Sequence, residues 1–447
     1  MSLAHRPDDV SPSVAALLAD LDMTPGSLDV AIDERDEMLA FLVEGMEGDR
    51  DRALFTYFHS GLSIADGMLQ VLRWRFGDRP LKVLDFASGY GRVTRFLVRE
   101  LPPESLWVSD VYEDGLRFQR ERLGVSTVLS TVRPEDFVLD ETFDAVLVTS
   151  LFTHLPEARF VDWLRVLCER LRPGGVLAFS THHPSLLEPC PDLPESGLLF
   201  RDNSESTSLD PGDYGSTWVT ESFVRNALAR VAPGCSVLRL ARGICNYQDF
   251  YVAVLGEGEP EVDFSSLEYT GQPHLFLEHC SHAGIDNLRI QGWAAVRTGT
   301  LEAVEVLLDG QVLASFPVDR DRPEVAALLG EDRYLRSGWG GMCPLPAGLS
   351  RFSAVLLIRM RDSRGVLHPM RAGSIDSLIL EATRNDLRAV QKKLVETGWE
   401  LEDLRGYTRA TVDGLRDKIS AMETSGFWKG RMAWFRLKRA LRLTDEE

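Results

Sequence analysis

The amino-acid sequence predicts an α/β protein: a doubly wound, mostly parallel sheet, followed by a β-rich region and a helical tail. Three observations lead to this fold class. Strand and helix patterns alternate between residues 81 and 181, strand patterns separated by turn signals fill residues 272–376, and helical spacing returns over residues 377–426. Strands that alternate with helices are typical of parallel sheets, because each helix carries the chain back to the start of the next strand.

Bulk composition limits the classes of function. The 447 residues suffice for two or three domains, and the hydrophobic share of 44% is ordinary for globular proteins. A net charge of −19 argues against a nucleic-acid partner, because phosphates are neutralised by Lys and Arg. The six cysteines show neither a C-x-x-C pair nor zinc-ligand spacing, so we expect no metal site. The sequence has no signal pattern and no apolar run of about 20 residues, so we expect a cytoplasmic protein.

The N-terminal 50 residues are expected to form an extension with a helix. Apolar residues recur at helical spacing between Asp33 and Phe76, and Gly45 and Gly48 interrupt this pattern. We therefore predict two helices ahead of the sheet.

The sheet itself is predicted from strand patterns at residues 81–87, 105–110, 125–131, 143–152 and 176–180. Helical patterns separate them at residues 92–101, 115–123 and 158–171. Two last strands, residues 236–247 and 249–255, are too close for a helical crossover and should form a hairpin. Residues 184–220 hold no period and contain five prolines, which favours a lid or substrate loop.

The strongest motif is VLDFASGYGRVTRFL, residues 83–97, where a strand meets a turn of small residues and then a helix. Ala87, Gly89 and Gly91 would let a ligand approach the backbone closely. A nicotinamide-binding G-x-G-x-x-G loop would place Arg92 at its last position, where close helix packing requires glycine. A dinucleotide fold is therefore disfavoured.

The pattern D-x-A-x-G-x-G instead resembles motif I of class I S-adenosylmethionine-dependent methyltransferases, which have a Rossmann-like sheet. FDAVLVTSLFTHLPE and CERLRPGGVLAFSTH resemble the fourth and fifth strand regions of that family. The resemblance implies a methyltransferase domain over residues 51–257 with S-adenosylmethionine as cofactor. The resemblance implies that Asp85, Ala87, Gly89 and Gly91 lie beside the methionine part of the cofactor. It also implies that Asp110 binds the ribose hydroxyls. Asp110 can alternatively cap the following helix.

Three further residues are weaker cofactor candidates. Asp136, in STVRPEDF, could contact the adenine or be a solvated loop acid. Tyr57 and Gly61, in YFHSG, resemble part of an N-terminal helix that closes over the cofactor. The alternative for this pair is a core aromatic residue beside a packing glycine.

A hydroxyl acceptor would need a base, and three histidines follow strands at the expected sheet edge: His154, His182 and His183. His182 resembles the histidine of a T-H-G segment in polysaccharide-linked methyltransferases, although His183 replaces the glycine. His154 can also be structural at a helix start, and either of the other two can stabilise a loop. Asp249, in a Q-D pair that resembles the same subgroup, could orient a histidine or satisfy hairpin backbone groups. Tyr214, on the irregular loop, could touch the acceptor.

Behind a linker at residues 258–271, residues 272–376 resemble a β-sandwich found on bacterial glycosyltransferases and methyltransferases of surface-polysaccharide assembly, through QGW and RPEV. We expect this sandwich to be a separate module. Residues 377–426 show near-heptad spacing interrupted near Gly398 and Gly406, which predicts coiled-coil helices and a homo-oligomer. The basic amphipathic tail, residues 427–447, resembles a terminal segment of bacterial glycosyltransferases. It suits an anionic membrane surface through residues 427–444, or a protein partner.

These features lead to three hypotheses. The first is an enzyme that methylates a hydroxyl of a sugar or glycan at the cytoplasmic face of the membrane. The second keeps the chemistry but takes a small secondary metabolite as acceptor. The third is a non-catalytic assembly protein that recruits glycosyltransferases, and the intact glycine loop with Asp110 argues against it.

Overall fold

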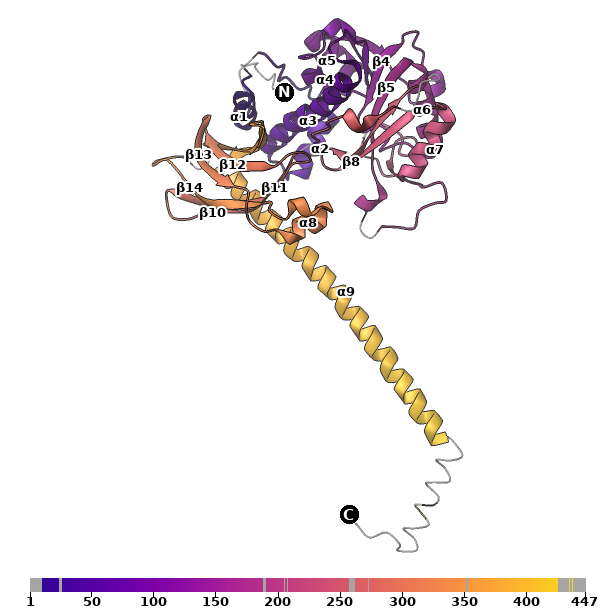
Figure 1. The fold of residues 1–447 in the computed structure, drawn as a ribbon, viewed down its shortest axis with the longest axis vertical. Coiled ribbons are helices and arrows are strands. Elements are labelled where there is room, and N and C mark those ends of the chain that lie inside the picture. The colour runs from indigo at the N-terminus through magenta and orange to yellow at the C-terminus, as the bar shows by residue number, and fades with distance from the viewer. Residues whose placement is uncertain are drawn as a thin grey trace. The chain divides into compact units, whose positions relative to one another are not determined.

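The computed structural model describes residues 10–23, 26–187, 190–204, 206, 208–256, 262–271, 273–350, 353–424, 434 and 436. It confirms the predicted fold class (Figure 1). The chain forms two compact units, residues 1–382 and residues 383–447. Within the described residues, no helix is both long and apolar enough to cross a membrane.

A seven-stranded sheet with the order β3-β2-β1-β4-β5-β9-β8 is the centre of the first unit. Its first five strands are parallel, β9 is antiparallel to β5, and β8 completes the predicted hairpin with β9. The strands are β1 (Val83–Phe86), β2 (Leu106–Asp110), β3 (Ser126–Leu129), β4 (Phe143–Val148), β5 (Leu171–Thr181), β8 (Ser236–Ile244) and β9 (Gln248–Val254). The sequence predicts a helix over residues 92–101, but the helix in the structure is much shorter: α4 covers only Thr94–Leu97.

Side chains of the buried strands alternate between two cores, as the two-residue period of a strand requires. Val83 of β1 packs on the side of α3, α4 and α5, whereas Leu84 packs on the side of α6 and α7. Figure 1 shows these two groups of helices on opposite faces of the sheet. The helices are α3 (Arg50–Phe76), α5 (Glu113–Leu123), α6 (Glu157–Glu169) and α7 (Glu221–Val231).

Two N-terminal helices precede α3: α1 (Pro12–Asp20) and α2 (Glu37–Gly45). The sequence predicts at most a loose helix in the first 30 residues, but α1 buries Val14, Leu17 and Leu18 in the core. Asp36 caps α2 by accepting hydrogen bonds from Met38 N and Leu39 N, and Asp49 caps α3 by accepting one from Arg52 N.

The irregular segment between β5 and α7 contains a short antiparallel ribbon of β6 (Leu198–Arg201) and β7 (Ser216–Val219). Backbone hydrogen bonds fasten its end to the segment after β4: Gly215 N donates to His154 O and Thr217 N to Thr153 O. These bonds hold the ribbon beside the carboxyl end of β4.

Beyond the linker, two antiparallel sheets share one core (Figure 1). One contains β10 (His274–His282), β11 (Asn287–Ala295) and β14 (Gly338–Pro344), and the other contains β13 (Gln311–Pro317), β12 (Leu301–Leu308), β15 (Val355–Asp362) and β16 (Leu367–Ser374). Helix α8 (Pro323–Leu329) lies between β13 and β14 in the sequence. An Asp309-Gly310 turn joins β12 to β13, and both residues have the positive φ that a tight hairpin turn requires.

The last element is α9 (Ile375–Thr424), a single helix where the sequence predicts interruptions near Gly398 and Gly406. Leu387, Val390, Leu394 and Leu415 are exposed on it. The coiled coil and the homo-oligomer stay predictions. So does the membrane-binding tail, because residues 425–447, apart from Trp434 and Arg436, lie outside the described residues.

Candidate active site

A cavity of about 400 Å³ opens at the carboxyl ends of β1, β2 and β4. In doubly wound sheets this edge is where ligands bind, because loops diverge there and backbone N–H groups point outward. Five predicted site residues line it: Asp85, Ala87, Gly89, Asp110 and His154.

The turn after β1 has the backbone conformation of a ligand-binding loop. Ala87 has a φ of 59°, an unusual value for a residue with a side chain, and Gly89 has a φ of 57°. A Cβ placed on Gly89 would meet no atom within 4 Å, so space remains beside this part of the loop. Gly91 has a different role: a Cβ there would lie 3.0 Å from Gln119 of α5, and Gly91 does not line the cavity. Ala87 and Gly89 therefore border the cavity, where the approach of a ligand stays a prediction, whereas Gly91 allows helix packing.

Asp110 ends β2 and connects two loops of the cavity. Its buried carboxylate accepts hydrogen bonds from Gly89 N at 2.7 Å and from Tyr112 N at 3.1 Å. Burial raises the pKa of this carboxyl, and the two backbone bonds oppose that shift. Both readings from the sequence are therefore compatible with the geometry, since Asp110 lines the cavity and also fixes the backbone at the start of α5.

Asp85, at the opposite side of the glycine loop, is buried and accepts a hydrogen bond from Thr94 Oγ1 at 2.8 Å. Burial raises the pKa of Asp85 to about 7. Together with Asp36, Glu37, Asp110 and Asp213, it gives the cavity five carboxyl groups, against two guanidinium groups from Arg35 and Arg92. Such a lining fits a cationic ligand that carries amino and sulfonium groups.

The raised pKa of Asp85 predicts a pH dependence of cofactor binding. A cationic cofactor favours the ionised carboxylate, so the affinity should fall as the pH drops from 8 to 6, by up to about tenfold per pH unit below 7. Titration calorimetry at several pH values measures this change. Asp85→Asn should bind weakly with a flatter pH profile. The same profile in the variant as in the wild type would assign the dependence to another group.

His154 is the one predicted histidine that lines the cavity. Its Nδ1 lies 2.7 Å from the carbonyl oxygen of Gly215, and its ring stacks on Tyr214 with centroids 4.4 Å apart. A carbonyl oxygen can only accept, so Nδ1 carries the proton of the neutral ring and Nε2 has the lone pair. Tyr214 of the irregular loop also lines the cavity, and its contact with an acceptor stays a prediction.

The other two histidines and Asp249 are described residues outside the cavity lining. His182 packs near Trp218 and Tyr247, and burial lowers its pKa to about 4, which makes it a weak base. His183 Nδ1 lies 2.9 Å from Ser185 Oγ. Asp249 binds Arg239 Nε at 2.7 Å and Arg242 N at 2.9 Å. The predicted link between Asp249 and a histidine is therefore replaced by an ion pair that closes the β8–β9 hairpin.

Tyr57, Gly61 and Asp136 also lie outside the cavity lining. Tyr57 is fully buried in the core and donates a hydrogen bond to Asp36. A Cβ on Gly61 would come within 2.3 Å of Arg92 O, so α3 approaches the glycine loop closely at this point. The alternative interpretation, a core aromatic residue beside a packing glycine, therefore describes Tyr57 and Gly61 better. Asp136 is exposed on a short 3-10 turn, and Ser130, Thr131 and Val132 line the cavity in its place.

Sequence reasoning missed the contribution of α2 and of Tyr112. Asp36, Glu37 and Phe41 come from the start of α2 and line the cavity. Tyr112 OH lies 3.1 Å from Glu37 Oε2, 3.0 Å from Ser206 Oγ and 2.8 Å from Ser208 Oγ, so it connects α2 with the irregular loop. The capping signal at Asp36 was visible in the sequence, but the position of α2 over the sheet was not.

Comparisons with known proteins give one family match and several similar solved structures. Residues 83–175 match a family described as a methyltransferase domain. No curated protein matches the sequence. DesVI of Streptomyces venezuelae is similar at 19% identity, with 50% of this chain and 99% of that chain covered and a TM-score of 0.34. CalS10, an amino pentose methyltransferase from Micromonospora echinaspora, is similar at 20% identity, with 48% and 96% covered and a TM-score of 0.34.

The family match and the strand order identify a class I methyltransferase domain that depends on S-adenosylmethionine. The family match covers the glycine loop, Asp110 and His154, which are the residues that gather at the cavity.

Proposed function

We propose that the chain methylates a hydroxyl group of a sugar, in a nucleotide-linked or lipid-linked glycan, with S-adenosylmethionine as methyl donor. The position of His154 carries this proposal. A histidine with its proton fixed on Nδ1 presents a basic Nε2, which is the group that a hydroxyl acceptor needs.

Different residues of the chain would hold the cofactor and activate the acceptor hydroxyl. Asp85, Asp110 and the backbone at Gly89 would hold the cofactor, which supplies an activated methyl group. His154 would accept the proton of the acceptor hydroxyl as the oxygen attacks. The Gly215 carbonyl would then stabilise the resulting imidazolium through Nδ1–H.

The irregular loop supports a polar acceptor. Its residues Ser206, Ser208, Asp213 and Tyr214 line the cavity, and Tyr214 stacks on His154. Hydroxyl and carboxylate groups can exchange hydrogen bonds with several sugar hydroxyls, and a ring such as that of Tyr214 can pack against the apolar face of a sugar.

Methyl-labelled S-adenosylmethionine offered with separate pools of nucleotide sugars, lipid-linked glycans and small aromatic metabolites tests the proposal. We expect label in a sugar pool, as a methyl ether that resists base hydrolysis. Label confined to the aromatic metabolites would favour the secondary-metabolite hypothesis. Cofactor binding without transfer to any pool would favour the non-catalytic one.

A further inference from the structure

We propose that Arg52 and Glu381 are positioning residues for the cofactor site. Through this pair, the sandwich and the first turns of α9 fix the position of α3. Helix α3 in turn fixes the position of α2 at the cavity. This inference rests on the cofactor site and is independent of the acceptor. It departs from the separate modules that the sequence predicts, because residues 1–382 form one compact unit.

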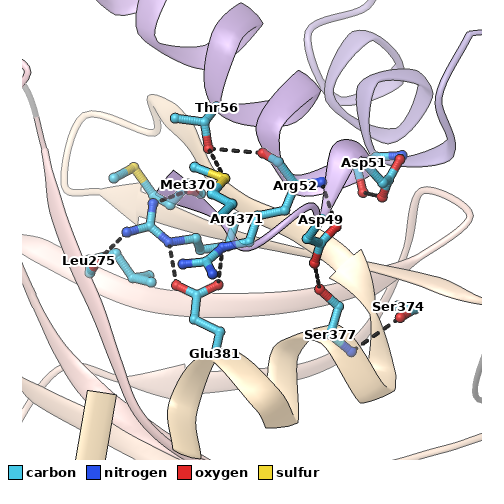
Figure 2. A network of polar contacts seen from close by, with 12 residues as sticks. Asp49, Asp51, Arg52, Thr56, Leu275, Met370, Arg371, Ser374, Ser377 and Glu381 are labelled. Atoms are coloured by element: carbon cyan, nitrogen blue, oxygen red, sulfur yellow. Dashed lines mark hydrogen bonds and ion pairs between the residues drawn. The ribbon is translucent and has the colours of Figure 1, made fainter. Parts of the chain in front are cut away.

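The first observation is a polar network between α3 and the C-terminal elements (Figure 2). The Glu381 carboxylate of α9 is only 5% exposed and lies between two arginines, 3.4 Å from Arg52 Nε of α3 and 3.2 Å from Arg371 Nε of β16. Asp49, which caps α3, also accepts a hydrogen bond from Ser377 Oγ of α9 at 2.9 Å. The start of α3 is thus fixed by two carboxylates that each bind both sides of the interface.

The second observation is a shared apolar core. Leu307, Leu357 and Ala372 of the sandwich belong to the same buried cluster as the apolar residues of α1 and α3. Arg359 of β15 also pairs with the buried Asp20 of α1 and with Glu305 of β12. Removing the sandwich would expose this cluster to water, which is costly in proportion to the apolar area.

The linker adds contacts along the second half of α3. Trp74 donates to Ser266 Oγ at 3.0 Å and stacks on Phe264, with centroids 5.3 Å apart. Gln70 Oε1 accepts a hydrogen bond from Thr270 N at 2.9 Å. The chain between the two folds is therefore fastened to α3 over about one turn, from Gln70 to Trp74.

Two hydrogen bonds connect helix α3 to the residues that line the cavity. Tyr57 OH donates to Asp36 Oδ2 at 2.6 Å, and Asp36 both caps α2 and lines the cavity. Ser60 Oγ accepts from Arg92 Nη1 at 2.8 Å, and Arg92 lies at the end of the glycine loop. Because helices move as rigid elements, a shift at Arg52 would reach both contacts within two turns of α3.

Glu381→Gln in the full-length protein tests this inference, because the amide has the same shape but cannot pair with two arginines. We expect the dissociation constant for S-adenosylhomocysteine to rise about tenfold in titration calorimetry, while the binding stoichiometry stays near that of the wild type. Hydrogen exchange of residues 37–45 should become faster. The matched control is Glu278→Gln, which breaks the pair with Arg322 inside the sandwich and away from α3, and should leave both measurements unchanged.

The stoichiometry and the folded fraction together separate positioning from simple loss of stability. A variant that is merely less folded would either bind fewer equivalents with an unchanged dissociation constant, or show a dissociation constant raised only by the reciprocal of its folded fraction, which circular dichroism measures at the temperature of the titration. Either result, or wild-type affinity and α2 exchange despite a lower melting temperature, would overturn the inference. Equal weakening by Glu278→Gln would also overturn it, because the effect would then not pass through α3. None of these outcomes depends on which acceptor is methylated.

Discussion

Replacing His154 is expected to lower the rate of methyl transfer by about 10²-fold or more, with little change in the dissociation constant for the cofactor. The reason is geometric: His154 lines the cavity with Nδ1 bound to the Gly215 carbonyl, so its Nε2 is the basic atom. His154→Asn is the sharper variant than His154→Ala, because an amide can still donate to that carbonyl but offers no basic nitrogen.

His182→Ala is the matched control for this prediction, since His182 lies outside the cavity lining and its pKa is lowered to about 4. Initial rates with labelled cofactor, and calorimetry with S-adenosylhomocysteine, compare the variants. A loss of turnover in His182→Ala with normal turnover in His154→Asn would move the base to the end of β5. Loss in neither variant would mean that the acceptor loses its proton without a histidine.

Asp110→Ala should weaken binding of S-adenosylhomocysteine by about 1–3 kcal/mol, which is the expected loss for hydrogen bonds to a buried carboxylate. Two effects combine in this prediction. The variant removes the acceptor assigned to the ribose hydroxyls, and it frees Gly89 N, which the carboxylate holds at 2.7 Å. Titration calorimetry measures the change.

Asp136→Ala provides the comparison, because Asp136 is an exposed acid near the end of the next strand and does not line the cavity. We expect its affinity to equal that of the wild type. If instead Asp136→Ala weakens binding and Asp110→Ala does not, the cofactor lies further along the sheet edge than the cavity suggests. A wild-type protein that fails to bind S-adenosylhomocysteine would contradict the assignment of the cofactor.

Several parts of this protein follow from local sequence patterns. Two-residue alternation indicates the buried strands, and turn residues indicate the Asp309-Gly310 turn. The order of strands and helices indicates the carboxyl edge of the sheet. The glycine loop is also recognisable locally, because its small residues, among them Ala87 and Gly89 with their positive φ, lie within five consecutive positions. The resemblance to motif I of class I methyltransferases predicted Asp85 and Asp110 as cofactor residues, and both line the cavity.

The tertiary structure decided what depends on residues far apart in the chain. The sequence offers three histidines at strand ends, and only the return of the loop to Gly215 and Tyr214 distinguishes His154 from the others. Likewise, nothing local shows that Glu381 binds Arg52, since 329 positions separate them and each has an ordinary helical context. Periodicity reports which face of an element is buried, whereas the partner on that face is chosen by packing of the whole chain. Packing of the whole chain likewise places the sandwich and the seven-stranded sheet in one compact unit, residues 1–382.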